Sequence, residues 1–220
     1  MYVDLHGAII EITLMHMKEY LDIVSSSIEN KQKEFDEFIE KEVRKIDPDD
    51  RDPFYEHYSD DYWRLNEVFP VFLYKSFIVS WYSFVENELF MFCNILEREN
   101  DLILSHKDLS DRGITQARKY LVKVAAIDLV QVHWNELINI GKIRNVIVHR
   151  DGDFTDAEIK DLKQYFDEHN LIENSRTNKF LPHLQYCRHL IELADNFFKN
   201  LYFDGGKTTS RSTYEKKRGK

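Results

Sequence analysis

The chain has 220 residues, of which 43% are hydrophobic and 14% aromatic, so it can bury a substantial core and is not disordered throughout. It contains only 7 Gly and 4 Pro, too few for the many turns of an all-β protein, which favours a mostly helical fold. Its formal net charge of −9 argues against a general nucleic-acid coat protein, because such proteins bind by neutralising phosphates. A local basic cleft remains compatible with that charge.

A long helix is predicted from residue 7 to residue 46. Its apolar residues recur in steps of three and four, the spacing that places side chains on one face of a helix. They include Ile10, Leu14, Met17, Leu21, Val24 and Ile28. Residues 47–53 combine two prolines with several acidic residues. This segment predicts the end of the helix and an exposed loop.

A second helical region is predicted over residues 60–99, with a kink near Pro70. Between Val71 and Leu96 it is apolar on nearly all sides, which is typical of the central helix of a bundle. Residues 68–85 approach the length of a membrane-spanning helix, but Pro70 and Lys75 interrupt them and Glu86 follows. We therefore expect a buried helix and no membrane association.

Further helices are predicted over residues 114–124 and 129–148. Thr155 and Glu158 have the spacing of a capping box, which predicts a short helix from Thr155 to about Asn170. A last helix follows Pro182 and ends near residue 204. These elements predict an all-α, antiparallel helical bundle that forms a single domain over residues 1–204.

Residues 205–220 have a different composition. They carry six basic residues and one acidic residue, so this segment has a charge of +5 and residues 1–204 have −14. With Gly205–Gly206 and a Thr/Ser run, it is expected to be a disordered basic tail. The two cysteines lack any paired spacing and the N-terminus lacks a secretion signal, which favours a cytoplasmic protein.

The sequence predicts no metal site and no cofactor. Nine histidines are scattered without the spacings of known zinc sites. His183 and His189 are six residues apart, about 240° around a helix, and are not expected to converge. There is also no glycine-rich loop of the kind that binds nucleotide phosphates.

Residues 143–152, at the end of the 129–148 helix, carry the most informative pattern. Asn145 and His149 are four residues apart and should face the same way. Arg144 and His149 are five apart, about 140° in an ideal helix, so they flank one cleft only if the helix end distorts or a second element approaches. The stop at Asp151–Gly152 can supply such a distortion.

These side chains have the chemistry needed for metal-independent RNA cleavage. Arginine is a permanently charged, planar clamp for phosphate. Histidine exchanges protons near neutral pH. Together they can promote attack by the RNA 2′-hydroxyl on the neighbouring phosphate.

The run from Arg144 through Asn145 to His149 resembles the Arg-x(4–6)-His signature of HEPN domains, helical domains found in prokaryotic toxin–antitoxin, abortive-infection and RNA-targeting defence ribonucleases. Asn directly after the Arg is the commonest form in that family, and Asp-Gly often follows. The resemblance covers roughly residues 65–204. It implies an acidic residue on an earlier helix near the Arg, for which Glu86 is the first choice and Glu88 the alternative.

The resemblance implies an endoribonuclease that acts as a homodimer, with two sets of these residues facing one cleft. His149 would be general base or acid, Arg144 would stabilise charge on the phosphorane, and Asn145 would orient the pair, with Arg150 and Asp151 in support. The products would end in 2′,3′-cyclic phosphate. RNA is the implied substrate, and an antitoxin or another component of a defence system is an implied partner.

Two other interpretations stay open. Arg144 and Glu86 can instead form a buried structural ion pair while His149 caps helical carbonyls. The chain can also be a non-catalytic scaffold whose long first helix and tail bind RNA or a partner, or a helical regulator without RNA activity.

Overall fold

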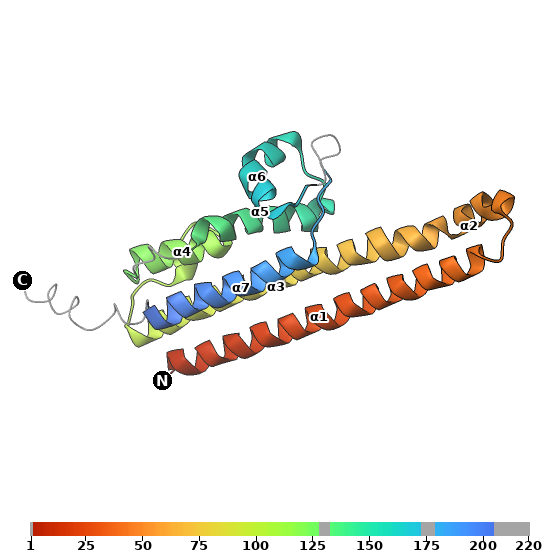
Figure 1. The fold of residues 1–220 in the computed structure, drawn as a ribbon. Coiled ribbons are helices and arrows are strands. Elements are labelled where there is room, and N and C mark those ends of the chain that lie inside the picture. Colours follow the sequence, from red (N-terminus) through yellow and green to blue (C-terminus); the bar gives the residue numbers. More distant parts are fainter. Residues whose placement is uncertain (1, 128–132, 173–178, 205–220) are drawn as a thin grey trace, which may run out of the picture.

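The computed structural model describes residues 2–127, 133–172 and 179–204, and these residues form helices and no strand (Figure 1). The predicted all-α class is confirmed. Within the described residues, the nearest approach to a sheet is an isolated antiparallel bridge between Ile172 and Phe180. The predicted tail, residues 205–220, lies outside the described residues.

Helix α1 spans Tyr2–Val43 and agrees with the predicted first helix, although it begins earlier. The prediction of an exposed loop over residues 47–53 is wrong in part. The chain does turn after α1, but it becomes helical again at a 3₁₀ turn, Pro48–Asp50, followed by α2, Arg51–Trp63. Both prolines lie in first turns, where a helix leaves its N–H groups unpaired, so they end one helix without preventing the next.

Between α2 and the next helix the chain makes a wider π turn, Arg64–Val68, and α3 then spans Phe69–Glu99. Pro70 lies in the first turn of α3, where the sequence predicts a kink. A proline cannot donate the usual backbone hydrogen bond, so a widened turn at this point has a direct cause.

Helix α3 is central, as predicted. It packs against α1, α4, α5 and α7, and Trp81, Val85 and Leu89 on it are fully buried. By length and composition alone, the helical stretch Pro48–Glu99 could also cross a membrane. That property is weak evidence for a membrane span, because the core helix of a soluble bundle has the same length and composition.

The remaining elements are a 3₁₀ turn at His106–Asp108, α4 at Gly113–Lys123, α5 at Trp134–Arg150, α6 at Asp156–His169, α7 at Leu184–Lys199 and a π turn at Asn200–Asp204. The predicted capping box is present: the Thr155 hydroxyl accepts from the Glu158 amide, and the Glu158 carboxylate accepts from the Thr155 amide. Helix α6 ends before Asn170, as predicted, and Asn170 itself is in a left-handed conformation.

The arrangement of the helices separates α1 from α5. In Figure 1, α3 and α7 lie between α1 and α5, and α6 lies on the far side of α5. Three side-chain pairs join α5 to α6, and their order along α6 is the reverse of their order along α5. They are Glu136–His169, Lys142–Asp161 and Arg150–Glu158. These pairs fix the relative position of α5 and α6.

Candidate functional site

Arg144 lies on the side of α5 that faces α3. Its guanidinium carbon is 5.9 Å from the centre of the Tyr82 ring, a cation–π contact, and its Nη1 donates a hydrogen bond of 3.1 Å to the Asn145 side-chain oxygen. Its Nε is buried and has no acceptor among the described residues. Arg144 also forms no ion pair within the described part of the chain, so the structural pair with Glu86 is not formed.

Of the two predicted acidic candidates, Glu86 is the one near Arg144. Burial and the Glu86 carboxylate raise the pKa of Tyr82 to about 12, while Arg144 acts in the opposite direction, which places all three groups in one neighbourhood. Glu88 lies elsewhere, 2.6 Å from His6 on α1.

The Glu86 carboxylate also lies against the first residue of α4. A Cβ at Gly113 would be 2.7 Å from Glu86 Oε1, and Gly113 has a φ of +63°. Glycine is therefore required there both by the backbone conformation and by the close approach. The N-terminal end of α4 is a favourable place for this negative charge, because the helix dipole is positive there.

Asn145 and His149 line the same groove between α5 and α6, as their spacing predicts. The groove has a volume of about 320 Å³. Its lining residues are Lys142, Asn145, Val146, His149, Arg150, Glu158, Asp161 and Leu162. The His149 side chain is exposed and makes no hydrogen bond to any described residue, so its ring nitrogens are accessible to a ligand in the groove.

Arg150 and Asp151 hold the end of α5 in place. Arg150 donates hydrogen bonds of 2.6 Å to both carboxylate oxygens of Glu158 on α6. Asp151 is left-handed, and Lys75 on α3 donates to its main-chain oxygen at 2.5 Å and to its carboxylate at 3.1 Å. These contacts fix the end of the helix that carries His149.

The helix distortion that the sequence allows between Arg144 and His149 does not occur. Helix α5 continues through Arg150, and the backbone first leaves the helical region at Asp151, with a φ of 52°. Arg144 and His149 therefore keep a separation of about 140° around the helix axis. They are connected through Asn145, which bonds Arg144 and shares the groove with His149.

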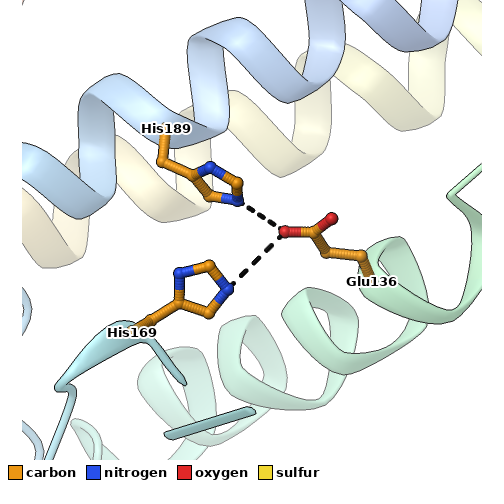
Figure 2. A group of neighbouring side chains, drawn as sticks. All are labelled: Glu136, His169 and His189. Carbon is orange, nitrogen blue, oxygen red and sulfur yellow. Dashed lines mark hydrogen bonds and ion pairs between the residues drawn. The ribbon is translucent and has the colours of Figure 1, made fainter. Parts of the chain in front are cut away.

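A second group of side chains, which the sequence did not reveal, comprises Glu136, His169 and His189; we call it the His–Glu cluster (Figure 2). The three residues come from α5, α6 and α7. His189 Nε2 is 2.5 Å from Glu136 Oε1, and His169 Nε2 is 3.7 Å from the same oxygen. Their side chains are 19% exposed for Glu136, 20% for His169 and 37% for His189.

The charges in the His–Glu cluster follow from these contacts. Burial alone would raise the pKa of Glu136, but the hydrogen bond and charge of His189 lower it below its usual value. The hydrogen bond to Glu136 raises the pKa of His189, and burial lowers the pKa of His169. The arrangement favours a charged His189–Glu136 pair beside a neutral His169.

The surroundings of the cluster set the position of His169. His183, the N-cap of α7, has its Nε2 3.0 Å from the His169 main-chain oxygen and accepts at Nδ1 from the Tyr186 amide. The Tyr165 ring centre lies 4.5 Å from that of His169. Tyr165 and Tyr186 are joined through their hydroxyls at 3.1 Å.

From the sequence, only the approach of Glu136 to His169 could have been predicted. The connection between α5 and α6 is short, so the start of α5 and the end of α6 can be expected to meet, which would bring Glu136 near His169. His189 has no such signal, because its approach depends on how α7 packs against the other helices. The prediction that His183 and His189 do not converge follows from their spacing on one helix, whereas His169 lies on a different helix.

Comparisons with protein-family models, with characterised proteins and with solved structures find no match to this chain.

Proposed function

We propose that the chain is a metal-independent endoribonuclease of the HEPN type. The observation that supports this most is the connection of Arg144, Asn145 and His149: Arg144 donates to the Asn145 side chain, and Asn145 and His149 line one groove. These three residues supply a phosphate clamp, a polar group that orients it and a proton-exchanging ring.

In the proposed reaction, His149 removes the proton from a ribose 2′-hydroxyl, and the 2′-oxygen attacks the adjacent phosphorus. Arg144 stabilises the negative charge that develops on the phosphorane oxygens. The bond from phosphorus to the 5′-oxygen breaks, and a protonated histidine returns a proton to that oxygen. One product ends in a 2′,3′-cyclic phosphate and the other in a 5′-hydroxyl.

A homodimer is part of the proposal. Arg144 and His149 of one chain point about 140° apart on an uninterrupted helix, so one phosphate is not easily reached by both. In a two-fold dimer the same surface of each chain meets its copy, and Arg144 of one chain can act with His149 of the other.

The biological setting belongs to the same proposal. A HEPN-like antiparallel bundle in the cytoplasm, acting in a toxin–antitoxin or antiviral defence system, would need a partner to restrain it. The reversed order of the side-chain pairs between α5 and α6 supports antiparallel packing for that pair of helices.

The test is cleavage of 5′-labelled single-stranded RNA by the purified chain in EDTA. His149→Ala and Arg144→Ala should each lower the rate, by about 10²–10⁴ for the histidine, without unfolding the protein. His16→Ala, an exposed histidine on α1, and Arg98→Ala, an exposed arginine at the end of α3, are matched controls and should cleave at the wild-type rate.

The chemistry of the ends provides a second readout. Product 3′ ends should resist ligation until a phosphatase active on cyclic phosphate has treated them. Cleavage by His149→Ala at the wild-type rate would reject this assignment of the site.

A second candidate function, a non-catalytic scaffold, is favoured by the outer face of α1. Exposed apolar side chains recur there at spacings of four, three, eight and three residues, which keep them on one side of the helix: Leu5, Ile9, Ile12, Tyr20 and Ile23. Such a face is typical of helices that pack against a partner. If the wild-type chain binds RNA without cleaving it, and His149→Ala binds RNA equally well, the scaffold function is selected over the ribonuclease.

A further inference from the structure

We propose that the His–Glu cluster binds a divalent transition metal ion, with zinc the best match to its ligands. Glu136, His169 and His189 each offer one donor atom, and these atoms lie within 4.8 Å of one another. Two imidazoles and one carboxylate form a known ligand set of zinc sites with three protein ligands. Figure 2 shows the three side chains directed toward one point from three helices.

The two distances to Glu136 require only a small adjustment, and the two imidazole nitrogens lie within 4.8 Å of each other. In a tetrahedral zinc site with bonds of about 2.0–2.2 Å, neighbouring ligand atoms are about 3.3 Å apart. The distance of 3.7 Å between His169 Nε2 and Glu136 Oε1 is close to that value. The 2.5 Å between His189 Nε2 and Glu136 Oε1 is a hydrogen bond, and it would open by about 1 Å as the metal replaces the shared proton.

The position of His169 is set before any metal arrives. The contact of His183 with the His169 main-chain oxygen and the packing of Tyr165 against the imidazole hold it at the end of α6. These contacts hold the backbone and the ring of His169 in place, so less ordering is needed when an ion binds. His189, the most exposed of the three, lies at the side from which an ion can enter, and the fourth coordination position is left for water or another ligand.

This site is separate from the proposed ribonuclease groove. Glu136 and His149 are thirteen residues apart on α5, about 20 Å along the helix. A bound ion would join the start of α5 to the end of α6 and to α7. It would thereby stabilise the packing of the three helices, and the inference does not depend on the proposed RNA chemistry.

The experiment is titration of the full chain with zinc chloride after treatment with a chelator and dialysis. Calorimetry should give a single ion per chain, and the midpoint of thermal unfolding should rise as zinc is added, because the metal binds only the folded cluster. His169→Ala and His189→Ala should weaken binding by at least about 100-fold. His16→Ala and His149→Ala should bind zinc like the wild type.

His169→Ala is the cleaner variant, because it removes only the 3.7 Å contact with Glu136 and keeps the His189–Glu136 hydrogen bond. Circular dichroism checks that it folds. If this variant does not fold, the wild-type chain is titrated with Co²⁺ and its visible absorption is measured. The strong absorption that is typical of Co²⁺ bound by four nitrogen and oxygen ligands supports the proposal. Absence of zinc uptake, wild-type uptake by folded His169→Ala, or absence of that absorption overturns it, and the cluster is then an ion pair alone.

Discussion

The hydroxyl of Tyr82 on α3 lies against Gly141 on α5, so closely that a Cβ at position 141 would be 2.5 Å from the hydroxyl oxygen and 3.0 Å from the ring carbon that carries it. The same ring lies under the Arg144 guanidinium at 5.9 Å. Tyr82 therefore sets both the distance between α3 and α5 and the position of the arginine that the proposed reaction requires.

Gly141→Ala tests this close approach. In an ordinary helix the change would stabilise by up to about 1 kcal/mol, because alanine is the better helix former. Here we expect a net loss of about 1–3 kcal/mol in the free energy of unfolding, because the methyl group forces α5 away from Tyr82. Urea denaturation measures it. The loss should be smaller in a Tyr82→Phe background, and a stabilised Gly141→Ala chain would contradict the packing.

Lys75→Met tests how the end of α5 is held. Lys75 is only 16% exposed, and its ammonium group bonds the main-chain oxygen and the carboxylate of Asp151. Methionine keeps the apolar stem but removes the positive charge from the C-terminal end of the helix, so we expect a loss of about 1 kcal/mol. Lys163→Met, which breaks an exposed pair within α6, is the control and should change stability by less than about 0.5 kcal/mol. Equal effects of the two variants would contradict this role.

Glu158→Gln tests the contact between α5 and α6 as a function of pH. The hydrogen bond from Arg150, followed by those from Thr155, lowers the pKa of Glu158 from its usual 4.5 to about 2. A lowered carboxyl pKa contributes stability above pH 4.5, and that contribution is lost as the pH falls toward 2. The wild type should thus be more stable than Glu158→Gln at pH 7, and the difference should shrink between pH 4.5 and pH 2. Glu19→Gln, an exposed residue of α1, should show no such trend.

Mixing two inactive variants tests the proposed composite site. If Arg144 of one chain acts with His149 of its partner, an Arg144→Ala chain and a His149→Ala chain in one dimer restore one complete site. After subunit exchange at equal concentration, RNA cleavage should recover to about a quarter of the wild-type rate, because half of the dimers are mixed and each has one working site. Failure to recover despite demonstrated exchange would place Arg144 and His149 of the same chain in one site.

Local patterns predicted most of the helices, although α2 begins earlier and α5 later than expected. Steps of three and four gave α1, and the Thr155–Glu158 spacing gave the start of α6, because each depends on residues within one or two turns. The segment from residue 47 to residue 53 was harder, since a proline that ends one helix is also compatible with the first turn of the next. The distortion that the sequence allowed near His149 did not occur, because the left-handed residue is Asp151, after the histidine.

The sequence by itself determined that the chain is helical and that Arg144, Asn145 and His149 share one helix, because both follow from spacing along the chain. Only the tertiary structure decided that Glu86 and not Glu88 lies near Arg144, and that Glu136, His169 and His189 meet. Those outcomes depend on how helices distant in sequence pack against one another, and that packing is set by the whole buried core and not by any local spacing.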